Sequence, residues 1–339
     1  MESVIVVVAG LAALAVVFWP RLGVAARLRR AAGVAERIRV EDAVKHLFTS
    51  EAARRPSSVE SLAGAIGITR GQVVEIIRHL ERLGLARLAA EDIVLTEDGR
   101  AYALRIVRTH RIWERYLADR TGVDPAQWHA QAERHEHGLA PEEVDRLAAS
   151  MGDPLYDPHG DPIPTALGAM PPVRGVPLVS LERGSSAWVV HVEDEPEEVY
   201  RTIRAAGIDV GSRLTVERVD ASALRLLVEG QPVTLDGIAA RNLTVEPLAV
   251  GDVDAAIERL DVLQPGEEGV VVRLAGQVQG PQRRRMLDLG IVPGTVIRAE
   301  LSSASGDPVA YRIRGAVIAL RRVQAQAILI RRRAQQEAA

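Results

Sequence analysis

The 339-residue chain has no cysteine and only one lysine, Lys45. Without cysteine there can be no disulfide bond, thiolate zinc site, iron–sulfur cluster or cysteine nucleophile, so any metal site has to be built from His, Asp, Glu or Met. The formal net charge of −3 excludes a bulk positive field that would draw the whole chain onto nucleic acid, but leaves room for a local basic patch. The length indicates about two domains or more.

Recognisable catalytic patterns are missing as well. No Ser/His/Asp order, nucleophile elbow or pair of catalytic acids stands out, and no glycine-rich stretch resembles a phosphate-binding loop. A metallohydrolase would need an HExxH-like zinc pair or a base beside an open ligand position, and the run from Glu133 to His137 lacks that pattern. We therefore expect a protein that is not an enzyme.

One long apolar run stands near the N-terminus. Ser3 to Trp19 is seventeen residues without a charge, roughly 25 Å of helix at ~1.5 Å per residue, which is the lower limit for crossing a bilayer. A basic stretch from Arg21 to Arg39 follows. This order predicts an uncleaved single-pass anchor in the cell inner membrane, with the C-terminal bulk in the cytoplasm. A signal peptide, whose charges would precede the run, and a buried helix or misassigned start are the alternatives.

Residues 41–100 carry the pattern of a winged helix-turn-helix. A capping box at Ser57 to Glu60 predicts one helix start, and a second box at Thr69 to Gln72 predicts another, with a turn at Gly67 between the helices. Such a pair is typical of a DNA-binding domain whose second helix enters the major groove. Strands at 85–88 and 93–95 would form the wing. The outward residues expected to contact DNA are Thr69, Arg70, Gln72 and Arg78; a protein contact is the alternative.

The next two predicted helices carry histidines and carboxylates at helical spacing. His110 and Glu114 are four residues apart on a helix over about 100–120, so they share a face. The following helix starts at Asp124-Pro125 and ends at Gly138. It carries a second set of such residues, which comprises His129, Glu133, Glu136 and His137. Imidazole and carboxylate together suit divalent transition metals, which predicts a metal site, while a charged surface helix is the alternative.

Residues 41–168 resemble the DtxR/MntR family of metal-dependent transcriptional repressors. The winged helix carries the likeness, together with the stretches 110–114 and 129–137 and the motif Asp-Pro-His-Gly-Asp-Pro-Ile-Pro at 157–164. The resemblance implies a homodimer formed through the helices after the wing. It also implies metal bound between those helices and the first helix of the DNA-binding domain.

Two sets of metal ligands follow from this resemblance. A primary site would use Asp42, Glu133, Glu136 and His137. An ancillary site would use His110, Glu114 and His129, although in manganese-type members His110 also belongs to a binuclear centre. The oxygen ligands favour Mn²⁺ or Fe²⁺, while Zn²⁺ would still bind. Lys45 stands where manganese-type members have a carboxylate, and its ammonium cannot ligate while protonated. This favours one well-formed metal site, or an altered centre, over a full binuclear one.

The C-terminal half contains a repeat of about 75 residues. Leu-Glu-Arg-Gly at 181–184 recurs as Leu-Gln-Pro-Gly at 263–266, and the run 206–212 recurs at 289–295. Each copy is predicted to be a small five-stranded β-barrel, and the second resembles FeoA-type domains. Tight turns with positive φ are expected at Gly207, Gly211, Gly290 and Gly294. In repressors with this first barrel, carboxylate or amide groups from the barrel complete the ancillary site, which makes the acidic cluster 193–198 a candidate; a solvated turn is the alternative.

These patterns predict an α+β multidomain protein, with a winged helix-turn-helix and a helical dimerisation domain followed by two FeoA-like barrels. The predicted segments are a transmembrane helix (1–20), a basic linker (21–40), the DNA-binding domain (41–100), the metal-binding and dimerisation helices (101–170) and barrels at 173–248 and 259–332. The predicted function is an Mn/Fe-responsive repressor of metal-uptake genes that binds palindromic double-stranded DNA as a dimer. The alternative is a sensor, anchored in the membrane through residues 3–19, that acts on a metal transporter through its FeoA-like domains without binding an operator.

Overall fold

The structure, a computed structural model, describes residues 24–89, 92–220, 222–248, 257–275 and 278–333. The chain divides into two compact units. The first unit extends to Arg108 and includes 166–168, and the second takes in 109–165 and the chain from 169 onward.

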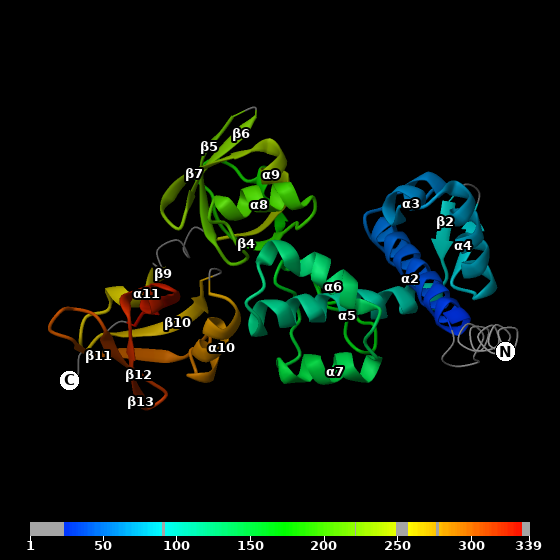
Figure 1. Cartoon of the computed structure of the whole chain (residues 1–339). Helices are drawn as coiled ribbons and strands as arrows, with labels where there is room; N and C mark the ends of the chain where they lie inside the picture. Colours follow the sequence, from blue (N-terminus) through cyan, green and yellow to red (C-terminus); the bar gives the residue numbers. More distant parts are fainter. Residues whose placement is uncertain (1–23, 90–91, 221, 249–256, 276–277, 334–339) are drawn as a thin grey trace, which may run out of the picture. The chain divides into compact units, whose positions relative to one another are not determined.

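The first unit is a winged helix-turn-helix, as predicted (Figure 1). Three helices pack together beside a two-stranded antiparallel wing, and the long helix α5 begins directly after it. The elements are α2 (Val24–Ala52), α3 (Val59–Ile66), α4 (Arg70–Arg82), β1 (Ala86–Ala89), β2 (Asp92–Leu95) and α5 (Glu97–Arg120). A core of apolar side chains joins α2, α3, α4 and the wing, and its fully buried members include Leu47, Leu62, Val73, Leu80 and Ile93.

Local capping sets the starts of α3 and α4. Thr69 and Gln72 form the predicted box at the start of α4. At α3 the prediction is wrong by one residue, because the box is formed by Ser58 and Ser61 rather than by Ser57 and Glu60. A serine hydroxyl at the third helical position also reaches the cap backbone N–H, so the box does not need the glutamate. Gly67 ends α3 at φ 66°, in the left-handed region that glycine adopts most easily.

The segment predicted as a basic linker over 21–40 is different in the structure. It is helical from Val24 onward and continuous with the first helix of the winged domain. The physical reason lies in its composition, because alanine, leucine and arginine favour a helix and Gly33 is the only glycine within α2. The predicted anchor at residues 3–19 lies outside the described residues. Within the described part of the chain, no helix combines the length and the apolarity needed to cross a membrane.

The second unit starts with helices. The C-terminal part of α5 is followed by η1 (Pro125–Gln127), α6 (Trp128–Glu136) and α7 (Pro141–Ser150). Asp124 caps η1 by accepting a hydrogen bond from the backbone N–H of Ala126, so the predicted helix start is confirmed, with one 3₁₀ turn before the α-helix. Ile112 of α5 packs with Val144 and Ala148 of α7 and with Ile163 of the loop that follows. This loop therefore lies against α5 and α7.

The first β-rich domain is a six-stranded antiparallel sheet with the order β3-β8-β4-β5-β6-β7. Its strands are β3 (Val176–Pro177), β4 (Ser186–Val192), β5 (Arg213–Val219), β6 (Ala223–Val228), β7 (Gln231–Asp236) and β8 (Leu243–Pro247). Its helices are η2 (Leu178–Ser180), α8 (Glu197–Ala205) and α9 (Gly237–Arg241). The apolar face of the sheet and the two α-helices share one core.

The second β-rich domain repeats this topology, with the strand order β9-β14-β10-β11-β12-β13. Its strands are β9 (Ile257–Arg259), β10 (Glu268–Leu274), β11 (Val296–Ser302), β12 (Val309–Ile313), β13 (Ala316–Leu320) and β14 (Ile328–Arg332). Its helices are η3 (Leu260–Val262), α10 (Gly280–Asp288) and α11 (Arg322–Gln326). The predicted turn glycines Gly207, Gly211, Gly290 and Gly294 all have positive φ. The internal repeat is thus a repeat of structure as well as of sequence.

The prediction of two closed five-stranded barrels is wrong. Each domain has six strands, and among the described residues no pairing joins the first strand of a sheet to its last. The extra strand in each copy is a short one, β3 or β9, at the edge of the sheet. Helices also cover the apolar face, because Tyr200 and Ile203 of α8 enter one core and Met286 of α10 enters the other. The apolar surface is therefore buried without closing the sheet.

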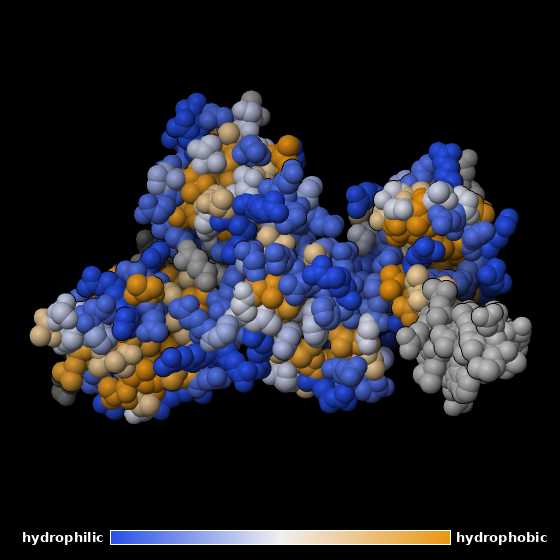
Figure 2. Space-filling view, in the orientation of Figure 1, coloured by the Kyte–Doolittle hydropathy of each residue, from blue (hydrophilic) through white to orange (hydrophobic). Residues whose placement is uncertain are grey.

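The two β-rich domains still present some apolar surface. Figure 2 shows apolar side chains over the part of the second domain where β12 and β13 lie in Figure 1. Exposed apolar residues of this domain include Leu301, Val317 and Val323. Scattered exposed apolar side chains are normal on soluble domains, so this surface needs no special explanation.

Candidate metal centre and nucleic-acid interface

The core of the candidate metal centre is a buried pair on α5. His110 and Glu114 are one helical turn apart, and the His110 Nε2 atom lies 3.0 Å from Glu114 Oε1. Both residues are almost fully buried, with exposed fractions of 5% and 2%. Buried ionisable groups are costly unless they are paired or bind a metal, so this pair is a strong candidate for a functional site.

The helix α6 adds His129 to this pair. Its Nδ1 atom lies 3.4 Å from Glu114 Oε1, and its Nε2 atom lies 3.5 Å from Glu133 Oε1. His110, Glu114 and His129 offer three ligand atoms that all lie within 4.8 Å of one another. The structure thus brings together the three residues predicted for the ancillary site.

A third element reaches the same place from the first β-rich domain. Directly after β4, Asp194 Oδ2 lies 3.0 Å from His129 Nδ1, and Glu195 Oε1 lies 3.4 Å from His129 Nε2. Both residues belong to the acidic cluster that the sequence singled out. Asp194 is half-buried, whereas the side chain of Glu195 is 69% exposed. Asp194 is therefore the better placed of the two to act as a ligand.

The motif at 157–164 supplies a further group, His159. Glu114, His159 and Asp194 form a second set of ligand atoms within 4.8 Å of one another. The motif carried the family resemblance, but its histidine was not predicted as a ligand. Asp194 and His159 were missed as specific ligands because they lie far along the chain from Glu114. The acidic cluster and the motif were the available signals.

The electrostatics of the centre are those of acids and imidazoles held close together. Burial alone would raise the pKa of the Glu114 carboxyl, but the charge of His110 and hydrogen bonds from His110 and His129 hold it well below its usual range. Burial would lower the pKa of His129, but hydrogen bonds to Asp194, Glu114 and Glu133 outweigh it and raise this pKa to about 12. Without a cation, His129 therefore carries the positive charge that the buried carboxylates need.

Glu136 and His137 lie at the end of α6. Glu136 Oε2 is 2.5 Å from His110 Nδ1, and Glu136 Oε1 is 3.7 Å from His137 Nε2. His110 thus faces Glu114 with one nitrogen and Glu136 with the other, which connects the two predicted ligand sets. Asp42 and Lys45 lie on α2 in the first unit, three residues apart along the helix. The role of Asp42 in the primary site stays a prediction.

The predicted DNA-contacting residues are all exposed on α4 or at its start. Thr69 and Gln72 use much of their hydrogen-bonding capacity in the capping box, where the Thr69 hydroxyl donates to Gln72 Oε1 at 3.0 Å. The guanidinium of Arg70 lies 3.1 Å from the carboxylate of Glu60 on α3, and its side chain is 75% exposed. Arg78 is also exposed, about two turns beyond Arg70 along α4. The arginines are therefore the freer candidates for contacts with DNA.

The fold and the centre define a class of protein. It is a winged-helix metalloregulator with a site of histidines and carboxylates on the helices α5 and α6. The profile described as the iron dependent repressor, metal binding and dimerisation domain, matches residues 96–165. The profile described as the FeoA domain matches residues 258–332.

Known proteins with similar sequences agree. The iron-dependent repressor IdeR of Mycobacterium tuberculosis is 33% identical over 189 residues, which span 51% of this chain and 82% of that protein. The diphtheria toxin repressor of Corynebacterium efficiens is 30% identical over 155 residues, 42% of this chain and 67% of the relative. A solved manganese-dependent transcriptional repressor in complex with manganese superposes with a TM-score of 0.57 at 31% identity, covering 62% of this chain and all of that one. The chain belongs to the family of iron- and manganese-dependent repressors that includes IdeR and the diphtheria toxin repressor.

Proposed function

We propose that the protein is a metal-dependent transcriptional repressor, responsive to Mn²⁺ or Fe²⁺, that binds palindromic DNA as a homodimer when metal-loaded and controls metal-uptake genes. The observation that carries this proposal is the cluster of His110, Glu114, His129 and Asp194, which three separate elements bring together. Membership of the repressor family supports the DNA-binding part and the dimer.

The donor set fits a divalent transition metal. Imidazole nitrogens and carboxylate oxygens are ligands that Mn²⁺, Fe²⁺ and Zn²⁺ all accept, and the absence of cysteine removes the thiolates that favour softer metals. A bound cation would supply the positive charge that the proton of His129 supplies without it. Binding therefore displaces this proton, while Glu114 and Asp194 are already held in the ionised form that ligation needs.

We further propose the primary site of the family, with Glu133, Glu136 and His137 of α6 and Asp42 of α2 as ligands. Its support is the resemblance in sequence, together with the placement of Glu136 and His137 beside His110. A cation shared between α6 and α2 would tie the DNA-binding unit to the metal-binding unit and bias the dimer toward one spacing of its two recognition helices. Lys45 adds a positive charge on the same helix as Asp42, which favours a single cation there over two.

On the DNA side, we propose that Arg78 contacts a backbone phosphate and that Thr69, Arg70 and Gln72 lie nearest the base edges. A phosphate contact contributes to affinity for every sequence and makes it depend on salt. The Arg78→Ala variant should therefore weaken binding uniformly and lower the salt slope by about one.

The experiment is operator binding by the full chain, measured by fluorescence anisotropy on the DNA upstream of its own gene. The chain is titrated with Mn²⁺, anaerobic Fe²⁺ and Zn²⁺, beside the double variant Glu136→Ala/His137→Ala. The control is His135→Ala, which removes an exposed histidine of the same helix that stacks on Trp113. We expect tight binding that needs metal, survives in the control and is lost in the double variant. Metal binding without any affinity for DNA would contradict the proposal and favour the transporter-linked sensor.

We also propose that residues 3–19 anchor the protein in the inner membrane with the remaining chain in the cytoplasm. The support is the uncharged run and the arginines that follow it, and this proposal is independent of the metal centre. Membrane fractionation of cells that express the full chain should place it in the membrane pellet, resistant to high salt. Recovery in the soluble fraction would contradict it.

A further inference from the structure

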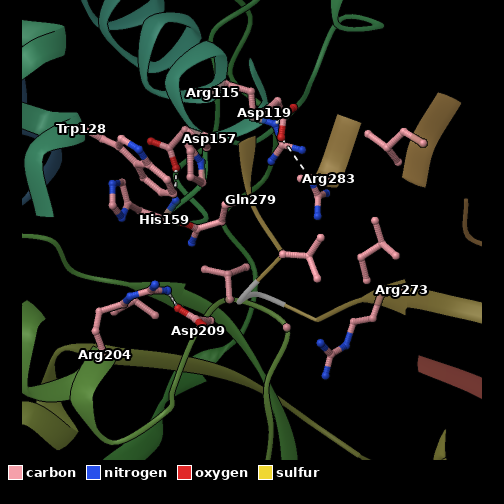
Figure 3. A pocket seen from close by; sticks show the side chains of 18 of the residues that line it. Arg115, Asp119, Trp128, Asp157, His159, Arg204, Asp209, Arg273, Gln279 and Arg283 are labelled. Atoms are coloured by element: carbon pink, nitrogen blue, oxygen red, sulfur yellow. Dashed lines mark hydrogen bonds and ion pairs between the residues drawn. The ribbon is translucent and has the colours of Figure 1, made fainter. Parts of the chain in front are cut away.

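A cavity of about 300 Å³ in the second unit is lined by residues of α5 and of both β-rich domains. Figure 3 shows Arg115 and Asp119 of α5 and Arg283 of α10 grouped together in its wall. Much of the remaining wall is aliphatic, and this part includes Val192, Leu274, Val278 and Leu287. Cavities that bind small molecules have this size and this mixture of apolar walls with a few polar groups.

Two arginines in this wall share one carboxylate. Arg115 Nε donates to Asp119 Oδ2 at 2.9 Å, and Arg283 Nε donates to Asp119 Oδ1 at 3.0 Å. Asp119 is buried, whereas the side chains of Arg115 and Arg283 keep exposed fractions of 24% and 25%. Each arginine thus uses its Nε group on Asp119, and its two terminal Nη groups have no hydrogen-bond partner among the described residues.

The charges of the wall are not balanced at this point. The other charged residues of the wall each have an oppositely charged partner: Arg204 with Asp209, Arg273 with Glu229, and Asp157 with Arg111. Arg115 and Arg283 together carry two positive charges against the single negative charge of Asp119. Burial and the charge of Arg115 lower the pKa of Arg283, although Asp119 opposes this change. A second negative charge beside the two arginines would therefore be stabilised.

The position of Arg283 is set by a close contact between α10 and the end of α5. Gly280 begins α10 at φ 55°, and a Cβ there would lie 2.0 Å from the carbonyl oxygen of Thr121, directly after α5. Another residue at this position would clash with that oxygen, and it would also adopt positive φ less easily. Arg283 follows three residues later, close to one helical turn, and from there reaches Asp119. The pair of arginines is therefore fixed by the backbone of both helices.

We propose that this cavity binds a small organic anion, whose phosphate or carboxylate group lies between Arg115 and Arg283 and whose apolar body lies against the aliphatic wall. Guanidinium groups bind phosphate and carboxylate through pairs of parallel N–H···O bonds, and the Nη groups of both arginines can form such pairs. The anion supplies the second negative charge that the two arginines lack. The proposal does not depend on the metal centre, since Arg115, Asp119 and Arg283 are not among its proposed ligands.

A bound anion would connect two parts of the chain. Arg115 directly follows Glu114 on the helix that carries metal-binding residues, and Arg283 lies on α10 of the second β-rich domain. An anion that contacts both arginines would hold α10 against α5, so local opening of α10 becomes less favourable when the cavity is occupied. Amide hydrogen exchange in α10 should therefore slow on binding.

The test measures binding of phenyl phosphate, benzoate and inorganic phosphate to the metal-free full chain by titration calorimetry. Phenyl phosphate and benzoate carry the same ring on two head groups, and inorganic phosphate has the head group alone. The variants Arg115→Gln and Arg283→Gln each remove one cation, and Arg283→Lys keeps the charge without the planar fork. The control is Arg312→Gln, since Arg312 pairs with Glu300 through its Nε and does not line the cavity. Circular dichroism verifies that each variant is folded.

We expect at least one of the two aromatic anions to bind more tightly than inorganic phosphate, because the aliphatic wall accepts the ring. Each Gln variant should lose about tenfold or more in affinity for it, and Arg283→Lys should fall between. The control should match the original chain. The tighter of phenyl phosphate and benzoate identifies the head group that the cavity takes, and hydrogen exchange of α10 should fall when that anion is present.

Two results would overturn the inference. One is that none of the three anions binds to the original chain, and the other is that an anion binds equally well to the original chain and to both Gln variants. Neither result affects the proposed function, because metal binding and operator binding are measured without these anions.

Discussion

The two β-rich domains share a strand order but differ at the segment that follows their equivalent strands β4 and β10. After β4 the chain reads Glu-Asp-Glu-Pro at 193–196, and Asp194 enters the metal centre. After β10 the chain reads Ala-Gly-Gln-Val-Gln at 275–279, with no carboxylate. One copy of the fold therefore places a carboxylate at the proposed metal centre, and the other has no carboxylate in the equivalent segment, so the proposed function belongs to the loop rather than to the sheet.

The helices after these segments differ in charge as well. The first turn of α8 carries Glu197 and Glu198, whereas α10 carries three consecutive arginines from Arg283. Arg283 Nε lies 3.0 Å from Asp119 Oδ1 on α5 (Figure 3). Here the β-rich domain supplies the cation, whereas in the contact between Asp194 and His129 it supplies the acid. Each domain thus contacts the helices through side chains of opposite charge. The first domain places the carboxylate of Asp194 at the proposed metal centre, and the second places the guanidinium of Arg283 against Asp119, outside that centre.

The largest expected effects come from matched core substitutions in the two domains. Ile208 and Ile291 follow equivalent turn glycines and are both fully buried. Ile208→Ala and Ile291→Ala should each destabilise their own domain by about 2 to 5 kcal/mol, measured by amide hydrogen exchange. Metal affinity should fall only with Ile208→Ala, since only that domain presents a ligand. Equal losses of metal affinity in both variants would contradict the difference between the domains.

A substitution of Asp194 tests the difference between the two β-rich domains at a single residue. Asp194→Ala should lower Mn²⁺ affinity by roughly ten- to a hundred-fold, because it removes a proposed ligand and a hydrogen-bond partner of His129. Glu198→Ala, an exposed acid on α8, is the control and should leave the affinity unchanged. Titration calorimetry measures both. If the two variants behave alike, general negative charge rather than a placed ligand explains the role of the first domain.

The pH dependence of metal binding also distinguishes the first β-rich domain, which contacts His129, from the second. Burial opposes protonation of His129, but its hydrogen bonds to Asp194 and to other carboxylates outweigh burial and raise its pKa to about 12. In the metal-free protein His129 therefore keeps its proton below that pH, and a cation has to displace it. Mn²⁺ affinity should rise by about tenfold per pH unit for each proton displaced.

Asp194→Ala should weaken this dependence by lowering the pKa of His129. Substitutions in the second domain should not change it. Affinity that is independent of pH in the unmodified chain would contradict the assignment of His129 as a ligand.

The smallest expected effect concerns the second domain. Arg283→Ala removes one of two ion pairs of the buried Asp119 and leaves the one with Arg115, so it should cost only about 0 to 1 kcal/mol of stability. Hydrogen exchange of α10 should increase slightly, and metal affinity should stay the same. A large loss of metal affinity in this variant would show that the second domain also supports the centre.

Local patterns in the sequence were enough to predict much of the molecule. Capping residues and helical spacing located α4, α5 and α6, because hydrogen bonds within one turn decide where a helix starts. The spacing of His110 and Glu114 placed both on one face of a helix, which is buried in the structure. The repeat of turn glycines predicted two similar β-rich domains, because positive φ is a demand that glycine meets locally.

The features that depend on contacts between distant residues were not predictable in the same way. No local pattern pairs Glu114 with Asp194 or His159, since their approach depends on how the β4 strand packs against the loop at 157–161. The open sheets were missed because helices, rather than closure of the strands into a barrel, bury the apolar face. The role of Asp42 as a primary-site ligand stays a prediction, because Asp42 lies in the first unit and the other ligands proposed for that site lie in the second.

The central claim is that one divalent cation is held jointly by the helices α5 and α6 and by the first β-rich domain. The most direct measurement is anomalous diffraction from crystals of the full chain grown with Mn²⁺. The account predicts an anomalous peak within bonding distance of Glu114, His129 and Asp194. A Mn²⁺ peak that lies away from these three side chains, or a manganese-loaded crystal in which Asp194 points to solvent, would contradict it.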